Sequence, residues 1–172
     1  MILKYLFVFI FIFVFAWFEK TLGYTTTSPL YTHFTYMFQH AGVMHLFINS
    51  FVFIGMFRAV EKYVNKWMLS VSCILIGFTA SFLSVYDIPT VGASGMIYAM
   101  IGMFVSITIF YKGAKINDIK KYAIFILAVC LSLLLSYFKH NSNFWLHVYS
   151  LSMGVVFGMI VSIYKNKKLW KI

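Results

Sequence analysis

The stretch SGMIYAMIGMFVSITIFYK, residues 94–112, decides the fold class of this chain. It carries no charged residue before Lys112. A helix rises about 1.5 Å per residue, so this stretch can cross most of a hydrocarbon core about 30 Å thick. Small residues recur along it every three or four positions, at Gly95, Ala99, Gly102 and Ser106. Because such stripes let helices pack closely within a bilayer, we interpret 94–111 as a membrane-spanning helix.

The composition of the whole chain is also typical of a membrane protein. Of its 172 residues, 62% are hydrophobic and 10% are charged, whereas soluble domains average roughly 45–50% and 25%. So few polar groups cannot cover a soluble core, which excludes an ordinary cytosolic domain, a disordered tail and a disulfide-stapled secreted module. The length suits a single domain, 1–172. Cys73 and Cys130 lie inside apolar stretches, and we interpret them as packing residues rather than redox groups or metal ligands.

Five further apolar stretches have the length of a membrane span, about 17–25 residues. The sequence therefore predicts an all-α polytopic bundle of six transmembrane helices, at about 2–18, 42–60, 67–86, 94–111, 120–138 and 143–164. These stretches are too long for barrel strands. The first could instead be a secretory signal. Trp17 and Phe18 follow Ala16 where a cleavage site needs small residues, so we favour a retained helix.

The basic residues set the expected orientation. With the N-terminus in the cytoplasm, 12 of the 14 lysines and arginines fall on the cytoplasmic side, as the positive-inside rule requires. They form short clusters between apolar stretches, so the net charge of +10 indicates membrane topology rather than nucleic-acid binding. Both termini are then cytoplasmic, and the loops 19–41, 87–93 and 139–142 face outward. Aromatic residues alternate with Thr, His and Met over 31–38, which favours an interfacial or half-embedded segment over a plain solvated loop.

Polar side chains inside spans are costly and are therefore candidates for function. Ser94, His147 and His45 each lie 17 or 18 residues from a basic residue at the inner end of their span. All three are thus expected at one depth, roughly 26 Å from the cytoplasmic edge. Asn49 follows His45 by one turn on the same face, and His40 is assigned to the same span.

A second stripe of small residues runs along the last span, at Ser150, Gly154, Gly158 and Ser162. If the two stripes face each other, Ser94 and His147, which stand at their outer ends, come together. Tyr98, one turn below Ser94, would then support the imidazole from beneath. The alternative is that a stripe drives homodimerisation or merely fits a crowded bundle.

Serine and histidine together can perform nucleophilic chemistry. A serine hydroxyl is activated by a base within hydrogen-bond reach, and a neutral histidine can be that base. The oxyanion formed by the attack needs donors, which the Ser94 amide and the His45 and Asn49 side chains could supply. The four acids lie in loops or on the cytoplasmic side, so a two-residue Ser–His arrangement is expected. Each residue also has a structural explanation, in helix packing or interhelical hydrogen bonding, but their shared depth favours catalysis.

Two of these segments resemble motifs of the rhomboid family. His40-Ala-Gly-Val-Met-His45-Leu-Phe-Ile-Asn49 resembles its second-helix pattern H-x-x-x-x-H-x-x-x-N. Gly92-Ala-Ser-Gly95 resembles its G-x-S-G nucleophile motif, and a matching Tyr98 and Gly102 follow. A third motif, His147 with Gly154, resembles the sixth-helix pattern H-x-x-x-G-x-x-x-G. The resemblance covers nearly the whole chain.

The resemblance implies an intramembrane serine protease. The roles it implies are Ser94 as nucleophile, His147 as general base, His45 and Asn49 with the Ser94 amide as oxyanion donors, and Tyr98, His40, Gly92, Gly95 and Gly154 as supporting residues. The implied substrates are transmembrane segments of other proteins, cut near their outer ends at small residues and helix-weakening sites. They would enter between the second and fifth spans, with the 139–142 loop as a cap and water arriving from the outer side.

Neither a metal, a cofactor nor a nucleic-acid partner is implied, and the oligomeric state stays open. Residue usage typical of an AT-rich genome favours a bacterial plasma membrane. The alternatives are a catalytically silent rhomboid-like protein that binds transmembrane helices, and a small transporter or channel. A transporter would need ionisable groups near the midplane and preferably repeated halves, which the sequence lacks.

The chain departs from the family pattern at two places. Tyr31-Thr32 stands where many members have Trp-Arg, which leaves open how the first outer loop is anchored. Ser150 replaces the first glycine of the sixth-helix pattern, so slightly looser packing is expected there. No extramembrane domain is expected.

Overall fold

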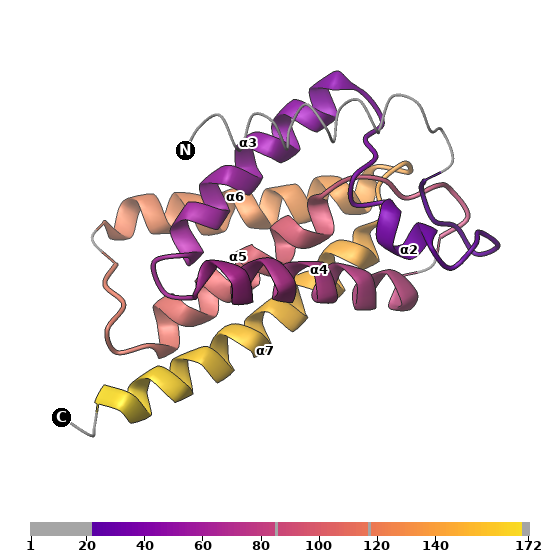
Figure 1. Ribbon diagram of the computed structural model, residues 1–172. Helices are drawn as coiled ribbons and strands as arrows, with labels where there is room; N and C mark the ends of the chain where they lie inside the picture. Colours follow the sequence, from indigo (N-terminus) through magenta and orange to yellow (C-terminus); the bar gives the residue numbers. More distant parts are fainter. Residues whose placement is uncertain (1–21, 85, 117, 170–172) are drawn as a thin grey trace.

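The computed structural model describes residues 22–84, 86–116 and 118–169 (Figure 1). The predicted first span, 2–18, and the alternative of a secretory signal lie outside the described residues. The described part is helical, with one isolated antiparallel bridge between Tyr24 and Thr90. Its helices are α2 (Thr32–Thr35), α3 (Val43–Val60), α4 (Lys66–Leu83), α5 (Ser94–Phe110), α6 (Ile119–Phe138) and α7 (Phe144–Leu169).

Four of these helices, α3, α4, α6 and α7, are long and apolar enough to cross a membrane. α5 is also apolar and has 17 residues, so it is about 25 Å long. This is somewhat shorter than the roughly 30 Å of a hydrocarbon core. The second to sixth predicted spans are therefore confirmed as apolar helices.

The predicted end of the third span is wrong. The third span was expected to reach residue 86, but α4 ends at Leu83. The carbonyl of Tyr86 instead accepts a hydrogen bond from the amide of Thr26 at 3.2 Å, which ties this segment to the outer loop. α7 continues beyond the predicted end of the sixth span, residue 164, to Leu169, and the point at which it leaves a bilayer stays a prediction. Its last turns contain lysines, which do not end a helix because lysine is a good helix former.

Among the described helices, α5 and α7 pack against each other most extensively. A Cβ atom added at Gly154 would collide with the backbone of Ala99, and one added at Gly102 would collide with the carbonyl oxygen of Leu151. A Cβ atom at Gly158 would likewise meet the Ser106 hydroxyl. The two stripes of small residues thus pack backbone against backbone, as predicted. Dispersion contacts at this short separation hold the pair together in lipid, where the hydrophobic effect contributes little between helices.

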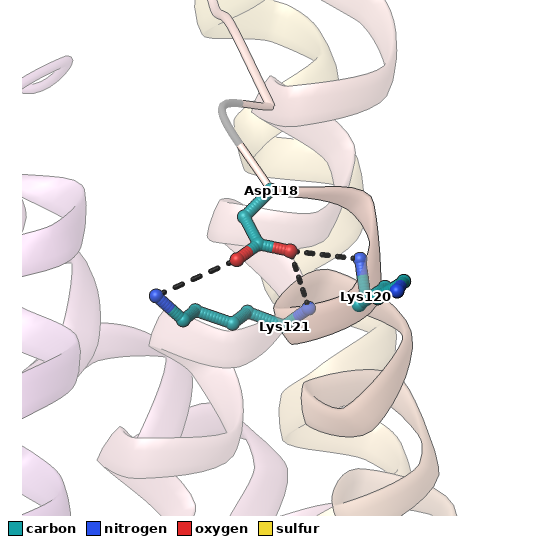
Figure 2. Close-up of polar contacts among 3 residues, drawn as sticks. All are labelled: Asp118, Lys120 and Lys121. Atoms are coloured by element: carbon teal, nitrogen blue, oxygen red, sulfur yellow. Dashed lines mark hydrogen bonds and ion pairs between the residues drawn. The ribbon is translucent and has the colours of Figure 1, made fainter.

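The N-terminus of α6 is fixed by Asp118. One carboxylate oxygen accepts hydrogen bonds from the backbone N–H groups of Lys120 and Lys121 at 3.0 and 3.1 Å, and the other lies 3.4 Å from the Lys121 ammonium (Figure 2). A carboxylate in this position satisfies amides that lack intrahelical partners and interacts favourably with the helix dipole. Asp118 therefore acts as the N-cap of α6 at the basic end of the bundle.

The outer segment before α3 is packed through buried polar residues. The His33 ring lies between Tyr24 and Phe82, with centroids 4.8 and 4.2 Å away, and its Nδ1 is 2.9 Å from the Ser81 hydroxyl. Burial lowers the pKa of His33, so the ring stays neutral at pH 7. Thr32 is buried and donates to the Pro29 carbonyl, whereas Tyr31 is exposed. The loop is thus anchored through Thr32 and His33, which answers the question raised by the Tyr31-Thr32 departure. Whether the segment is half-embedded in lipid stays a prediction.

Candidate active site

Two cavities stand out in the described part of the chain. The larger, about 350 Å³, lies between α3 and α4 and has almost entirely apolar walls. The smaller, about 200 Å³, brings hydroxyl, imidazole and amide groups together. Its lining residues are His45, Asn49, Thr90, Val91, Ser94, Tyr98, Ser142, Asn143 and His147. Because chemistry needs convergent polar groups, the smaller cavity is the candidate site.

Ser94 and His147 meet in this cavity. Ser94 is the first residue of α5, and its Oγ lies 3.0 Å from Nε2 of His147, in the first turn of α7. This distance is within the range in which a histidine can take a proton from a serine hydroxyl. The Tyr98 ring stacks on the imidazole, with centroids 4.4 Å apart and planes 24° from parallel. Tyr98 thus contacts a face of the His147 ring, and Ser94 contacts its edge at Nε2.

Asn143 sets where α7 begins and so where His147 lies. Its side-chain oxygen accepts a hydrogen bond from the Leu146 amide at 3.1 Å, as an N-cap does. Its side-chain nitrogen has three acceptors within 3.1 Å: the Tyr24 hydroxyl, the Ser84 carbonyl and the Thr90 hydroxyl. These bonds join the start of α7 to the segment that leads into Ser94. Sequence reasoning missed this role, although an asparagine immediately before an apolar helix is an N-cap signal.

His45 and Asn49 line the opposite wall of the cavity, on α3. The Nδ1 atom of His45 accepts a long hydrogen bond, 3.4 Å, from the Ala41 amide, which assigns the ring proton to Nε2. Asn49 is 8% exposed, and its side-chain nitrogen has no hydrogen-bond partner among the described residues. A buried donor without a partner is uncommon and calls for a functional explanation.

Gly92 allows these two side chains to approach the loop before α5. Its φ is +117°, a conformation that L-residues with a side chain rarely adopt. A Cβ atom here would lie 2.9 Å from Cε1 of His45 and 3.0 Å from the side-chain nitrogen of Asn49. Its amide donates to the Tyr36 carbonyl at 2.9 Å, which holds the loop in place. Both the backbone conformation and the close approach therefore require glycine.

His40 was assigned to the second span, but it lies before α3, which begins at Val43. Gly42, the N-cap of α3, has extended backbone angles, so the helix begins only after it and His40 stays outside the helix. The His40 ring meets His45 edge-on, with centroids 5.2 Å apart. Burial and the neighbouring His45 lower the pKa of His40 to about 4, so it remains neutral at pH 7. It contacts His45 but lines the larger, apolar cavity rather than the smaller one.

Gly95 and Ser150 lie close together between α5 and α7. A Cβ atom at Gly95 would lie 2.8 Å from the Tyr36 hydroxyl oxygen and 3.4 Å from the Ser150 hydroxyl oxygen. Ser150 is fully buried. The serine at the first glycine position thus fills space left by Gly95, and the looser packing expected there is absent.

A further contact to His147 comes from α6 and was missed by sequence reasoning. The Ser136 hydroxyl lies 2.9 Å from Nδ1 of His147 and 2.7 Å from the Ser142 hydroxyl. One turn away, the Ser132 hydroxyl lies 2.8 Å from the Tyr98 hydroxyl. The available signal was two serines four positions apart in an otherwise apolar helix, a spacing that places both on one face.

A comparison with known protein families gives a match for most of this chain. Residues 27–164 match the family model described as Rhomboid domain. A search of curated proteins found no match. The matched range contains every residue that lines the smaller cavity.

Proposed function

This chain belongs to the rhomboid family of intramembrane proteases, and on that premise we propose that it is a serine endopeptidase with a Ser94–His147 dyad. It is an integral membrane protein with several apolar helices. The observation that carries the proposal is the 3.0 Å contact between Ser94 Oγ and His147 Nε2 within a polar cavity. The family alone leaves inactive members possible, and this contact favours an active one.

The proposed reaction follows from the dyad. Ser94 Oγ attacks the carbonyl carbon of the scissile peptide, and its proton passes to Nε2 of His147. The tetrahedral intermediate collapses when His147 returns that proton to the leaving amine. Water then attacks the acyl-Ser94 ester with His147 again as base, which releases the second product and restores the serine.

Three donors are proposed to stabilise the oxyanion. The Ser94 amide stands at the start of α5, where a backbone N–H has no intrahelical acceptor. The side-chain nitrogen of Asn49 is buried and without a partner in the described part of the chain, and Nε2–H of His45 lines the same cavity. Donors positioned before the reaction stabilise the developing charge at little reorganisation cost.

Gly92→Ala should test the geometry of this donor wall. The new Cβ atom would press on His45 and Asn49, and φ of +117° would be strained, so we expect the cleavage efficiency to fall at least about tenfold. The matched control is Gly42→Ala, since Gly42 has extended backbone and no atom within 4 Å of its Cβ position. Initial rates per folded enzyme measure the effect. Equal rates for the two variants would contradict the assignment.

The proposed substrates are transmembrane segments of other proteins, admitted laterally from the bilayer. α3 packs against α5 and α6 packs against α7, while α3 and α6 make few contacts with each other in the described residues. This arrangement supports entry between the second and fifth predicted spans, with the 139–142 loop as a cap. We further propose a single domain over 1–172, an active site toward the extracytoplasmic side, and a bacterial plasma membrane as the location.

Labelling with a fluorophosphonate probe tests the function without any knowledge of the substrate. An activated serine attacks the phosphorus and becomes covalently modified, whereas an ordinary serine does not. We expect one adduct on the folded wild type, located at Ser94 by mass spectrometry. Ser94→Ala should remove it, and Ser152→Ala, which deletes an exposed hydroxyl on α7, should not. Folded wild-type protein without an adduct would favour a catalytically silent helix-binding protein.

A further inference from the structure

Ser136 differs from every other residue of α6 in its burial. It is 5% exposed, and it is the buried residue of this helix, whose other side chains are exposed or half-buried. α6 also packs less extensively against the bundle than α3, α4 or α5 do. A buried hydroxyl on a loosely packed, apolar helix therefore stands out, and its position beside His147 gives it a chemical context.

The hydrogen-bond directions around His147 form a consistent chain. If Nε2 accepts the Ser94 proton, the neutral imidazole must carry its own proton on Nδ1. That proton needs an acceptor, and the Ser136 Oγ lies 2.9 Å away. Ser136 can then donate its own hydroxyl proton to Ser142 Oγ at 2.7 Å. In this chain Nε2 of His147 accepts from Ser94, Nδ1–H of His147 donates to Ser136, and Ser136 donates to Ser142.

We propose that Ser136 is a positioning residue for His147, an inference that rests on the proposed Ser94–His147 function. By accepting the Nδ1 proton it selects the tautomer whose Nε2 faces Ser94, and it holds the ring in that orientation. When Nε2 receives the serine proton, the Ser136 oxygen also faces the resulting imidazolium. This is the task that a carboxylate performs in a three-residue triad. Here a neutral hydroxyl, held by Ser142, performs it.

The position of Ser136 on α6 links the dyad to the docking of that helix. Ser132, one turn away on the same helix, bonds the hydroxyl of Tyr98, and Tyr98 stacks on His147. Two hydroxyls of α6 thus hold the two rings of the site. A displacement of α6 from α7 would break the Ser136 contact and release His147 from its orientation.

Kinetics of two variants test the role. Ser136→Ala removes the acceptor, so kcat should fall about three- to tenfold, the size expected for one lost hydrogen bond, with KM unchanged. Ser136→Thr retains the hydroxyl and should keep at least half of the wild-type kcat. Ser152→Ala, an exposed serine that bonds its own helix, should match wild type. All rates are normalised to folded enzyme. Wild-type kcat in Ser136→Ala, or equal losses in the alanine and threonine variants, would overturn the proposal.

A spectroscopic measurement separates this inference from the function on which it rests. In protein labelled with ¹⁵N-histidine, the hydrogen-bonded Nδ1 proton of His147 should give a downfield resonance, assigned by its absence in His147→Ala. We expect it to vanish in Ser136→Ala and to remain in Ser152→Ala. If wild type cleaves nothing while the resonance behaves in this way, the proteolytic function fails and the contact stands. A resonance unchanged by Ser136→Ala would overturn the inference even in an active enzyme.

Discussion

Ser94→Ala is expected to lower the cleavage rate at least about a thousandfold while the melting temperature stays close to that of wild type. The hydroxyl is the proposed nucleophile, and its one hydrogen bond in the described part of the chain is to His147. Its removal therefore abolishes the chemistry but weakens packing little. Initial rates on a single-span substrate and thermal unfolding in the same detergent measure the two effects.

The dyad also predicts how two changes combine. Because Ser94 and His147 act as one unit, the double variant should be no slower than either single variant. Ser106→Ala is the matched control, since this buried serine of α5 bonds only the carbonyls of its own helix. It should fold and cleave like wild type. Effects that multiply in the double variant, or more than a tenth of the activity left in Ser94→Ala, would contradict a dyad.

Gly154→Val should prevent the bundle from assembling in its present form. The added side chain would meet the backbone of Ala99, and no rotamer of a neighbour can relieve a clash with backbone. We expect a loss of at least about 3 kcal/mol in the free energy of unfolding. Activity should be lost as well, because α7 carries His147 and must lie against α5 for that ring to reach Ser94.

The chain contains a matched control for this substitution. Gly55 lies on α3 with no atom within 4 Å of its Cβ position, so Gly55→Val makes the same chemical change in open space. Its melting temperature and cleavage rate should stay near wild type. Thermal unfolding and size-exclusion chromatography compare the two variants. Equal stability of Gly154→Val and Gly55→Val would show that close contact between α5 and α7 is not required.

Much of the fold could be predicted because bilayers impose simple rules. A continuous apolar stretch must be helical when its backbone has no water to bind, and this located α3 to α7 to within a few residues. Small residues at a spacing of three and four predicted the α5–α7 pair, because only glycine, alanine and serine permit such close backbones. The predicted position of His40 and the predicted end of the third span were wrong because loop geometry and loop hydrogen bonds, not hydropathy, decide them.

The roles of Ser136 and Asn143 in the site were not predicted from the sequence for a different reason. Ser136 and Asn143 act through contacts with residues distant along the chain, such as His147 and Tyr24. Spacing within one helix can place two hydroxyls on the same face, but it does not identify the residue of another segment that each of them will meet. The roles assigned to Ser94, His147, His45 and Asn49, and the orientation drawn from the lysines, remain predictions that experiments must test.

Cleavage in proteoliposomes tests the central claim most directly. A tagged substrate with a single transmembrane segment and small residues near its outer end is incubated with wild type, Ser94→Ala and His147→Ala, and mass spectrometry locates the new termini. The account predicts a product from wild type alone, cut within the outer part of the segment. The same product from Ser94→Ala, or none from folded wild type across several such substrates, would contradict it.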